Sequence, residues 1–274
     1  MHALVILPPP QLTHLCSVLQ PAHRVTAVTS SVEMTEVARR EAVDVVVIDP
    51  SMSGIITVPE IIGFRRAFPS LPLIPYTSMT AAAMRAVTEL APHGISSVML
   101  YRVDDSAQRL LDVLRSRPTD SLTPRVLERL APELARLTQR VRAGVLQLFQ
   151  EPQSFRGVED LARAAGVTSR TLYRQFEVAG FASARSMVLG ARLLRAYVWL
   201  RDPANSAQDV VRKLGFSSRQ QFGRQLMAAT GASPRVLRSL ASDAQIVDRL
   251  VALLTASPGD SPDDDEMHVA PADT

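Results

Sequence analysis

The sequence predicts an α/β domain with a five-stranded parallel sheet at the N-terminus, followed by an all-α domain. Over residues 1–117, short apolar runs rich in β-branched residues alternate with helix-like stretches, which is typical of buried parallel strands covered on both faces. From about residue 133 to residue 256 every periodic stretch is helical. The 274 residues are enough for two separate hydrophobic cores.

Five predicted strands account for the sheet. The strong apolar runs are residues 3–7, 43–48 and 71–76, and the weaker ones are residues 23–29 and 95–100. The helix-like stretches between them include residues 32–41, 80–90 and 105–117.

The remaining chain divides where its composition changes. Pro118, Pro124 and Pro132 punctuate a predicted linker with short helical pieces over residues 118–140. A longer helix is predicted over residues 133–150, and its apolar stripe fits a core-facing helix of the next domain, which we favour, or a dimer seam. The further predicted segments are a helical domain over residues 141–240, an extra helix over residues 241–256 and an acidic, disordered tail over residues 257–274.

The composition limits the class of protein. There is no run of about 18 uncharged apolar residues, so we expect no membrane span. The N-terminus lacks the basic start of a signal peptide. Cys16 is the only cysteine, which argues against a disulfide framework and a thiolate metal cage. We therefore expect a cytoplasmic protein with no bound metal and no cofactor.

The net charge of +3 conceals a strong asymmetry. Residues 1–117 carry 10 basic and 10 acidic residues, whereas residues 155–238 carry 14 basic and 5 acidic residues. The last stretch, residues 258–274, has 6 acidic residues and no Lys or Arg. Basic charge concentrated in one domain is typical of a surface that binds a polyanion, although a solvated basic face has the same composition.

Two segments of the helical region share one pattern. Each has a short amphipathic helix, a glycine, an apolar residue that fills the angle between helices, a Ser or Thr, and a second helix. Gly166 and Gly215 are predicted to adopt the left-handed conformation that lets the chain turn sharply between the helices. Thr168 and Ser217 are the predicted N-caps of the second helices. The pattern predicts two helix-turn-helix units.

One helix is predicted to join the two units. It spans residues 184–201, which corresponds to about 27 Å of α-helix. Successive major grooves on one face of DNA are about 34 Å apart, so a rigid connector of this length would hold both second helices in adjacent grooves. The arrangement predicts binding of double-stranded DNA.

Over about residues 140–240 the pattern resembles the AraC/XylS family of transcription regulators. The residues that carry the resemblance are Leu161-Ala162, Gly166-Val167, Leu172 to Phe176, Arg192 with Ala196 and Leu200, Leu214-Gly215-Phe216, Phe222 with Arg224, and Gly231-Ala-Ser-Pro234 before Arg238. Val210-Val211 stands where the family often has Ile-Ala, which changes packing only. The resemblance implies a bacterial regulator of transcription that works with RNA polymerase.

The second helix of each unit supplies the side chains expected to read bases. Arginine can form bidentate hydrogen bonds to guanine and glutamine to adenine, each worth about 1–3 kcal/mol of discrimination. The predicted DNA-binding residues are Ser169, Arg170, Thr171, Tyr173 and Arg174 in the first unit and Ser218, Arg219, Gln220, Gln221 and Arg224 in the second. The predicted phosphate contacts, which position the protein without reading sequence, are Arg163, Arg185, Arg212 and Lys213. For Arg192 we favour a structural role, bracing the connector helix against a carboxylate.

The first 117 residues resemble the receiver domains of response regulators, which have a flavodoxin-like parallel sheet. The third predicted strand and the loop after it, residues 43–54, carry the resemblance. Asp49 stands at the place of the phospho-acceptor and Thr77 at the place of the switch hydroxyl. The resemblance implies a phosphoryl-transfer site in which carboxylates hold Mg²⁺ and a lysine neutralises the phosphoryl group.

The chain departs from the receiver pattern at the other positions of that site. Pro8-Pro9-Pro10 replaces the acidic pair after the first strand, and Tyr101-Arg102 replaces the Lys-Pro of the fifth strand. With Asp49 as the only acid in place, Mg²⁺ would bind poorly. We therefore interpret the domain as a degenerate receiver in which Asp49 caps a turn. It would serve as an input or dimerisation module for a protein partner or a small effector.

The leading hypothesis is a sequence-specific, nucleoid-associated transcription regulator without enzymatic activity. A phosphorylation-controlled response regulator that uses Asp49 is the alternative. A DNA-associated enzyme is less favoured, because the five histidines are scattered without metal or triad spacing. The sequence leaves open the operator, the inducing signal and the oligomeric state, a homodimer included.

Overall fold

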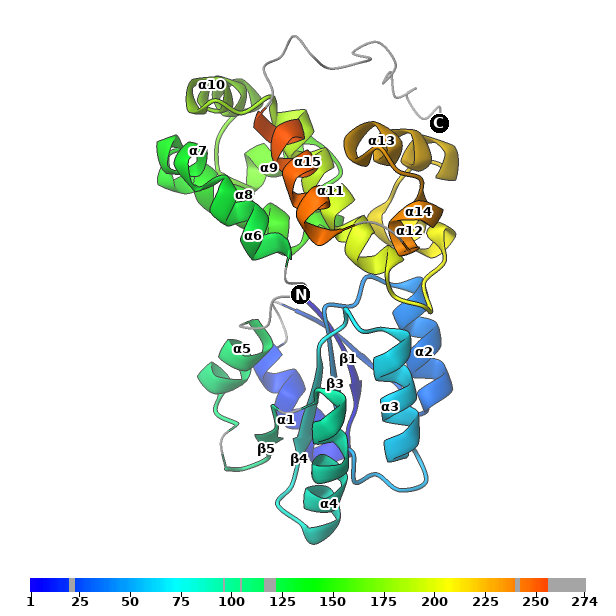
Figure 1. The fold of residues 1–274 in the computed structure, drawn as a ribbon. Coiled ribbons are helices and arrows are strands. Elements are labelled where there is room, and N and C mark those ends of the chain that lie inside the picture. Colours follow the sequence, from blue (N-terminus) through cyan, green and yellow to red (C-terminus); the bar gives the residue numbers. More distant parts are fainter. Residues whose placement is uncertain (20–22, 96, 104, 116–121, 240–241, 256–274) are drawn as a thin grey trace, which may run out of the picture.

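The computed structural model in Figure 1 describes all residues except 20–22, 96, 104, 116–121, 240–241 and 256–274. It has a five-stranded sheet with flanking helices in the N-terminal region and only helices after it, which confirms the predicted fold class. The acidic tail predicted over residues 257–274 lies outside the described residues. Within the described ranges, no helix is long and apolar enough to cross a membrane.

All five strands run parallel, in the order β2-β1-β3-β4-β5. Their bounds are β1 (His2–Ile6), β2 (Arg24–Ala27), β3 (Val45–Ile48), β4 (Leu73–Thr77) and β5 (Met99–Leu100). The winding of the sheet reverses between β1 and β3, and doubly wound folds place functional residues at the carboxyl ends of the strands at this point. Asp49 follows β3 directly and lies at that edge.

Helices cover both faces of this sheet. On one face lie α1 (Pro9–Leu19) and α5 (Ala107–Arg115), and on the other α2 (Ser31–Arg40), α3 (Val58–Ala67) and α4 (Ala81–Leu90) (Figure 1). Side chains alternate between the two faces along a strand. Val45 and Val47 of β3 therefore pack on the face covered by α1 and α5, whereas Val46 and Ile48 pack on the face covered by α2, α3 and α4. Every residue of β3 is therefore buried, which explains its unbroken apolar run.

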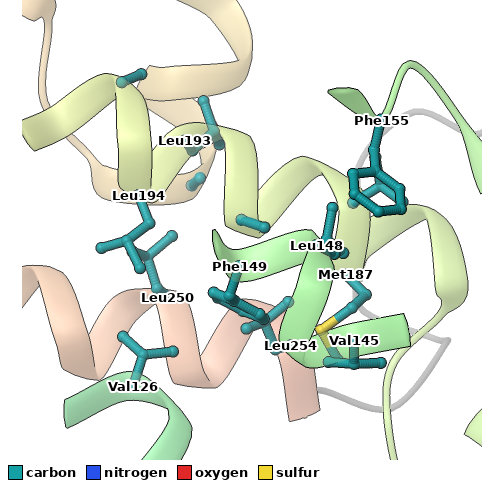
Figure 2. Packing of buried hydrophobic residues seen from close by; sticks show 14 of the residues in the cluster. Val126, Val145, Leu148, Phe149, Phe155, Met187, Leu193, Leu194, Leu250 and Leu254 are labelled. Atoms are coloured by element: carbon teal, nitrogen blue, oxygen red, sulfur yellow. The ribbon is translucent and has the colours of Figure 1, made fainter. Parts of the chain in front are cut away.

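The helical region has its own hydrophobic core. Its helices are α6 (Leu122–Arg129), α7 (Ala131–Arg136), α8 (Gln139–Gln150), α9 (Val158–Ala164), α10 (Ser169–Ala179), α11 (Ala184–Leu200), α12 (Ala207–Leu214), α13 (Arg219–Thr230), α14 (Pro234–Ser239) and α15 (Asp243–Thr255). Figure 2 shows Val126 of α6, Phe149 of α8, Leu194 of α11 and Leu250 of α15 in one cluster. Since α6 and α15 contribute to this core, we propose a second domain that spans residues 122–255.

The single helix predicted over residues 133–150 is wrong, because the chain breaks between α7 and α8. Leu137 and Thr138 are extended, with ψ angles of 149° and 153°. The backbone N–H and the hydroxyl of Thr138 both donate to Oε1 of Gln175 on α10, at 3.2 and 2.8 Å. The apolar stripe of α8, which includes Val141 and Val145, is fully buried in the core. This confirms the core-facing interpretation of the stripe over the dimer seam.

Candidate nucleic-acid interface

The first helix-turn-helix unit consists of α9 and α10. Gly166 between them has a φ of 63°, the left-handed conformation predicted for it. Thr168 caps α10 as predicted, since its hydroxyl accepts a hydrogen bond from the N–H of Thr171 at 3.2 Å. Leu172 and Phe176 are at most 1% exposed and hold α10 against the core.

The second unit consists of α12 and α13, and the stretch from its glycine to the N-cap of its second helix is one residue longer than in the first unit. Gly215 has a φ of 67°, as predicted. The predicted cap, Ser217, is wrong: Ser218 is the N-cap of α13, and its hydroxyl accepts from the N–H of Gln221 at 3.1 Å. The hydroxyl of Ser217 instead donates to the Gln221 side chain. The burial of Phe222 sets this register.

The extra residue between the glycine and the N-cap changes which residues of the two units correspond. Each second helix buries two apolar side chains four residues apart, Leu172 and Phe176 in α10 and Phe222 and Leu226 in α13. When these pairs are superimposed in sequence, Arg174 corresponds to Arg224 and Arg170 to Gln220. The two helices therefore present similar but not identical polar faces.

Most of the predicted DNA-binding side chains lie at the surface. Ser169 and Gln221 are half-buried, and the exposed ones are Arg170, Thr171, Tyr173, Arg174, Ser218, Arg219, Gln220 and Arg224. Figure 1 shows α10 and α13 on the side of the helical region that faces away from the sheet. Within the described part of the chain, Arg170, Arg174, Arg219 and Arg224 form no ion pair.

The connector α11 is a buried helix of 17 residues that packs against both units. Arg192 on α11 donates from Nη2 to the carbonyl oxygen of Leu214, at 2.7 Å, and its guanidinium lies 4.2 Å from the ring centroid of Phe216. Burial lowers the pKa of Arg192. The brace predicted for Arg192 therefore exists, but its acceptor is a carbonyl at the turn of the second unit, not the carboxylate we expected.

The four predicted phosphate contacts have different surroundings. Arg163 and Arg185 are exposed, and Arg163 pairs with Asp160 at 2.8 Å. Arg212 pairs with Asp209 at 2.6 Å and donates to the carbonyl oxygen of Arg39 at 3.4 Å. In the second unit the basic residues of α12 thus face the receiver-like domain.

Lys213 is half-buried and lies beside the contact between the two domains. Its Nζ donates to Oδ1 of Asn205 at 2.8 Å and lies 5.2 and 5.9 Å from the ring centroids of Trp199 and Phe68. Burial lowers the pKa of Lys213 to about 8. The lysine ammonium is therefore occupied by contacts within the protein.

Asp202, in the loop after α11, forms a polar contact between the domains. Its carboxylate accepts from the N–H and hydroxyl of Ser70, at 2.9 and 2.5 Å. Next to it, the N–H of Ala204 donates to the carbonyl oxygen of Ala67 at the end of α3, at 3.1 Å. Asp202 is 2% exposed, and this burial raises its pKa to about 6. The contact links the loop before α12 to α3.

Asp49 lies at the carboxyl edge of the sheet and is 2% exposed. Its Oδ1 accepts from the N–H and hydroxyl of Ser51, at 2.9 and 2.7 Å, and from the hydroxyl of Thr77, at 2.7 Å. Its Oδ2 accepts from Nε2 of Gln11 at 2.8 Å. The bond to Ser51 N–H caps the turn after β3, as the sequence analysis favoured. Both carboxylate oxygens are thus used within the domain.

Gln11 and Asp202 are the important residues that the sequence did not predict. Where the receiver pattern has acidic residues after β1, Gln11 provides an amide that donates to Asp49. The only sequence signal for this contact was the position of Gln11 directly after the three prolines. Asp202 gave no local signal, because its partner Ser70 is 132 residues away. Among the described residues, no group of three or more His, Cys, Asp or Glu side chains is placed to hold a metal ion.

Comparison with known protein families supports the assignment of helix-turn-helix units in the helical region. Residues 161–239 match a family described as a helix-turn-helix domain, of the AraC type. No curated protein matches the chain. Among solved structures, the chain is similar to full-length FixJ from B. japonicum, with 18% identity and a TM-score of 0.39, over 79% of this chain and 98% of that chain. This similarity is too low to support the fold assignment. The receiver-like description rests on the strand order of the sheet.

The matched domain and the geometry of its two units define the class of protein: a DNA-binding transcription regulator. This chain combines an AraC-type helix-turn-helix domain with a receiver-like domain in front of it.

Proposed function

We propose that the chain binds a specific site on double-stranded DNA and places α10 and α13 in successive major grooves. The observation that carries the proposal is the pair of exposed helix faces joined by one buried helix. The 17 residues of α11 correspond to about 26 Å, close to the spacing of about 34 Å between major grooves on one face of DNA. The proposed base-reading residues are Arg170, Arg174, Gln220 and Arg224. The rest of the proposed surface consists of Ser169, Thr171, Tyr173, Ser218, Arg219 and Gln221.

The proposed phosphate contacts differ between the units. Arg163 and Arg185 are exposed on the first unit, and phosphate contact there requires at most the opening of the ion pair between Arg163 and Asp160. Arg212 and Lys213 of the second unit already have partners near the receiver-like domain. Their role as phosphate contacts requires that these contacts open.

We infer that the receiver-like domain is an input module that acts on the second unit. Support comes from the contacts of Asp202 and Arg212, which join the domain to both ends of α12. Control by phosphorylation of Asp49 is disfavoured, because its oxygens accept four hydrogen bonds and are buried. We propose RNA polymerase and an effector of the N-terminal domain as further partners, with dimerisation as an additional role of that domain. The proposed setting is the nucleoid in the cytoplasm, without enzymatic activity.

The proposal is tested by changing one reading arginine and one phosphate arginine. In vitro selection with the wild-type chain first yields the preferred DNA site. Arg224→Ala is then expected to weaken binding to that site by roughly 10- to 100-fold and to relax base preference in one half of it, with little change on random DNA. Arg163→Ala is expected to weaken binding to both DNAs equally and to lower the salt slope by about 1.

Arg129→Ala is the control, because Arg129 is an exposed arginine that pairs with Asp248 on the helical domain. Its binding constants should equal those of the wild type. If Arg224→Ala lowers the affinity for specific and random DNA by the same factor, Arg224 is a phosphate contact and its base-reading role is excluded.

A further inference from the structure

Three exposed arginines lie on α10 and at the start of α11, and we name this set the α10 arginine face. Arg170 and Arg174 lie on α10, and Arg185 lies in the first turn of α11. None of the three has an ion-pair partner within the described ranges, whereas the neighbouring Arg163 pairs with Asp160. Their charge is available to an anionic partner.

The C-terminal helix α15 ends near the α10 arginine face. Its first residue, Asp243, accepts a hydrogen bond from Tyr197 near the end of α11, at 2.9 Å. Near its other end, the carbonyl oxygen of Leu254 accepts from the N–H of Ala182, at 2.9 Å, in the loop between α10 and α11. α15 therefore runs antiparallel to α11 and ends beside α10, as Figure 1 shows. Thr255, the last residue of α15, therefore lies near the loop that follows α10.

The segment that follows α15 has the opposite charge. Residues 256–274 contain six acidic residues and no Lys or Arg, and four of the acids are consecutive, Asp263 to Glu266. The 11 residues of α10 span about 16 Å. Eight residues of extended chain, from Thr255 to Asp263, reach about 26 Å. The acidic residues can therefore reach every guanidinium of the α10 arginine face.

We propose that the acidic segment Asp260–Glu266 binds the α10 arginine face of its own chain and competes there with DNA. The attraction between opposite charges needs no fixed geometry, and the segment is held beside its site at a high effective concentration. Random DNA and the specific site must both displace the segment, so the competition lowers the affinity for each by the same factor. The inference rests on the proposed role of α10 in DNA binding.

The first test neutralises the segment in the full chain, with Asp260, Asp263, Asp264 and Asp265 changed to Asn and Glu266 to Gln. Affinity for random DNA is expected to rise roughly tenfold at low salt, and the gain should vanish at high salt because the competition is electrostatic. The matched control deletes residues 267–272, which shortens the chain after the acidic segment without removing an acid. That variant should bind random DNA as the wild type does. Equal affinities for the neutralised and wild-type chains overturn the inference.

The second test separates a specific contact from general charge repulsion. A labelled peptide of residues 256–274 is added to the neutralised full-length chain, and its binding is followed by fluorescence anisotropy. The peptide is expected to bind, to be displaced by DNA, and to bind several-fold more weakly after Arg170→Ala and Arg174→Ala together, but not after Arg129→Ala. A peptide that binds all three chains equally contradicts the proposed surface. If Arg224→Ala still loses specific binding in that case, only this inference fails and the proposed function stands.

Discussion

The two helix-turn-helix units follow one pattern but lie in different surroundings. The first unit packs mainly against α7, α8 and α11, all within the helical region. The second packs against α11 and α15, and its helix α12 also packs against α2 of the receiver-like domain. A structural change in the receiver-like domain therefore reaches α12 of the second unit directly. Its contacts near the first unit, between Met1 and Glu151 and between Asp44 and Gln153, lie at the end of α8 and not on the unit itself. The first unit is suited to anchor the protein on DNA and the second to respond to a signal.

The turns of the two units are also held by different kinds of contact. In the first, Gly144 of α8 lies so close to Ala165 that a Cβ atom at position 144 would be 3.1 to 3.3 Å from the Cβ, N and Cα of Ala165. In the second, the Arg192 side chain holds the carbonyl of Leu214. The first turn thus depends on the absence of a side chain, and the second on the presence of one.

The largest effect is expected from Gly144→Val. The valine Cβ alone would lie 3.2 and 3.3 Å from the backbone N and Cα of Ala165, which cannot move aside without shifting α9. We expect the free energy of unfolding to fall by about 3 kcal/mol, measured by urea denaturation. Gly63→Val, at a helical glycine of α3 with open space around it, is the matched control and should change stability little. Equal losses in the two variants would mean that the close approach to Ala165 is unimportant.

A smaller and more local effect is expected from Arg192→Met. Methionine keeps the apolar stem but removes the charged donor to Leu214 and the contact with the Phe216 ring. The expected loss is about 2 kcal/mol. Hydrogen exchange should become faster in α12 and α13 and stay unchanged in α9 and α10. Uniformly faster exchange in both units would contradict a brace that belongs to the second unit alone. Arg129→Met is the control for loss of an exposed arginine.

The difference between the units also marks how far the sequence could predict the structure. The periodicity of apolar residues determines the order and type of the elements, and Gly166 and Gly215 mark both turns. Ser217 and Ser218 are equally good caps by residue type, so local pattern leaves two registers for α13. Only the packing of Phe222 in the core selects one of them.

Contacts between residues far apart in the sequence could not be predicted from the local pattern, for a different reason. The hydrogen bond from Gln11 to Asp49 joins residues 38 positions apart, and that from Ser70 to Asp202 joins residues 132 positions apart. Such partners meet only when whole elements have packed. The residue type of Lys213 and its position on α12 predicted a phosphate contact. The sequence could not show that Phe68 and Trp199 pack around its ammonium group.

The smallest effect is expected from Asp202→Asn, which tests the link between the second unit and the receiver-like domain. Burial raises the pKa of Asp202 from 3.8 to about 6. The folded state therefore binds this proton more tightly than the unfolded state, so the free energy of unfolding falls as the pH rises from about 4 to about 6. Asparagine does not titrate, and its side-chain oxygen can still accept from Ser70. The variant should lose this pH dependence.

The pH window separates Asp202 from its neighbour. Burial lowers the pKa of Lys213 from 10.5 to about 8, so Lys213 contributes stability that is lost as the pH falls from about 10 to about 8, outside the window of Asp202. Urea denaturation at several pH values, with the exposed Asp248→Asn as control, resolves the two. If Asp202→Asn keeps the wild-type slope between about pH 4 and pH 6, the carboxylate is not buried in solution. The contact between Asp202 and Ser70 would then be absent, and Arg212 and the packing of α12 on α2 would link the second unit to the receiver-like domain.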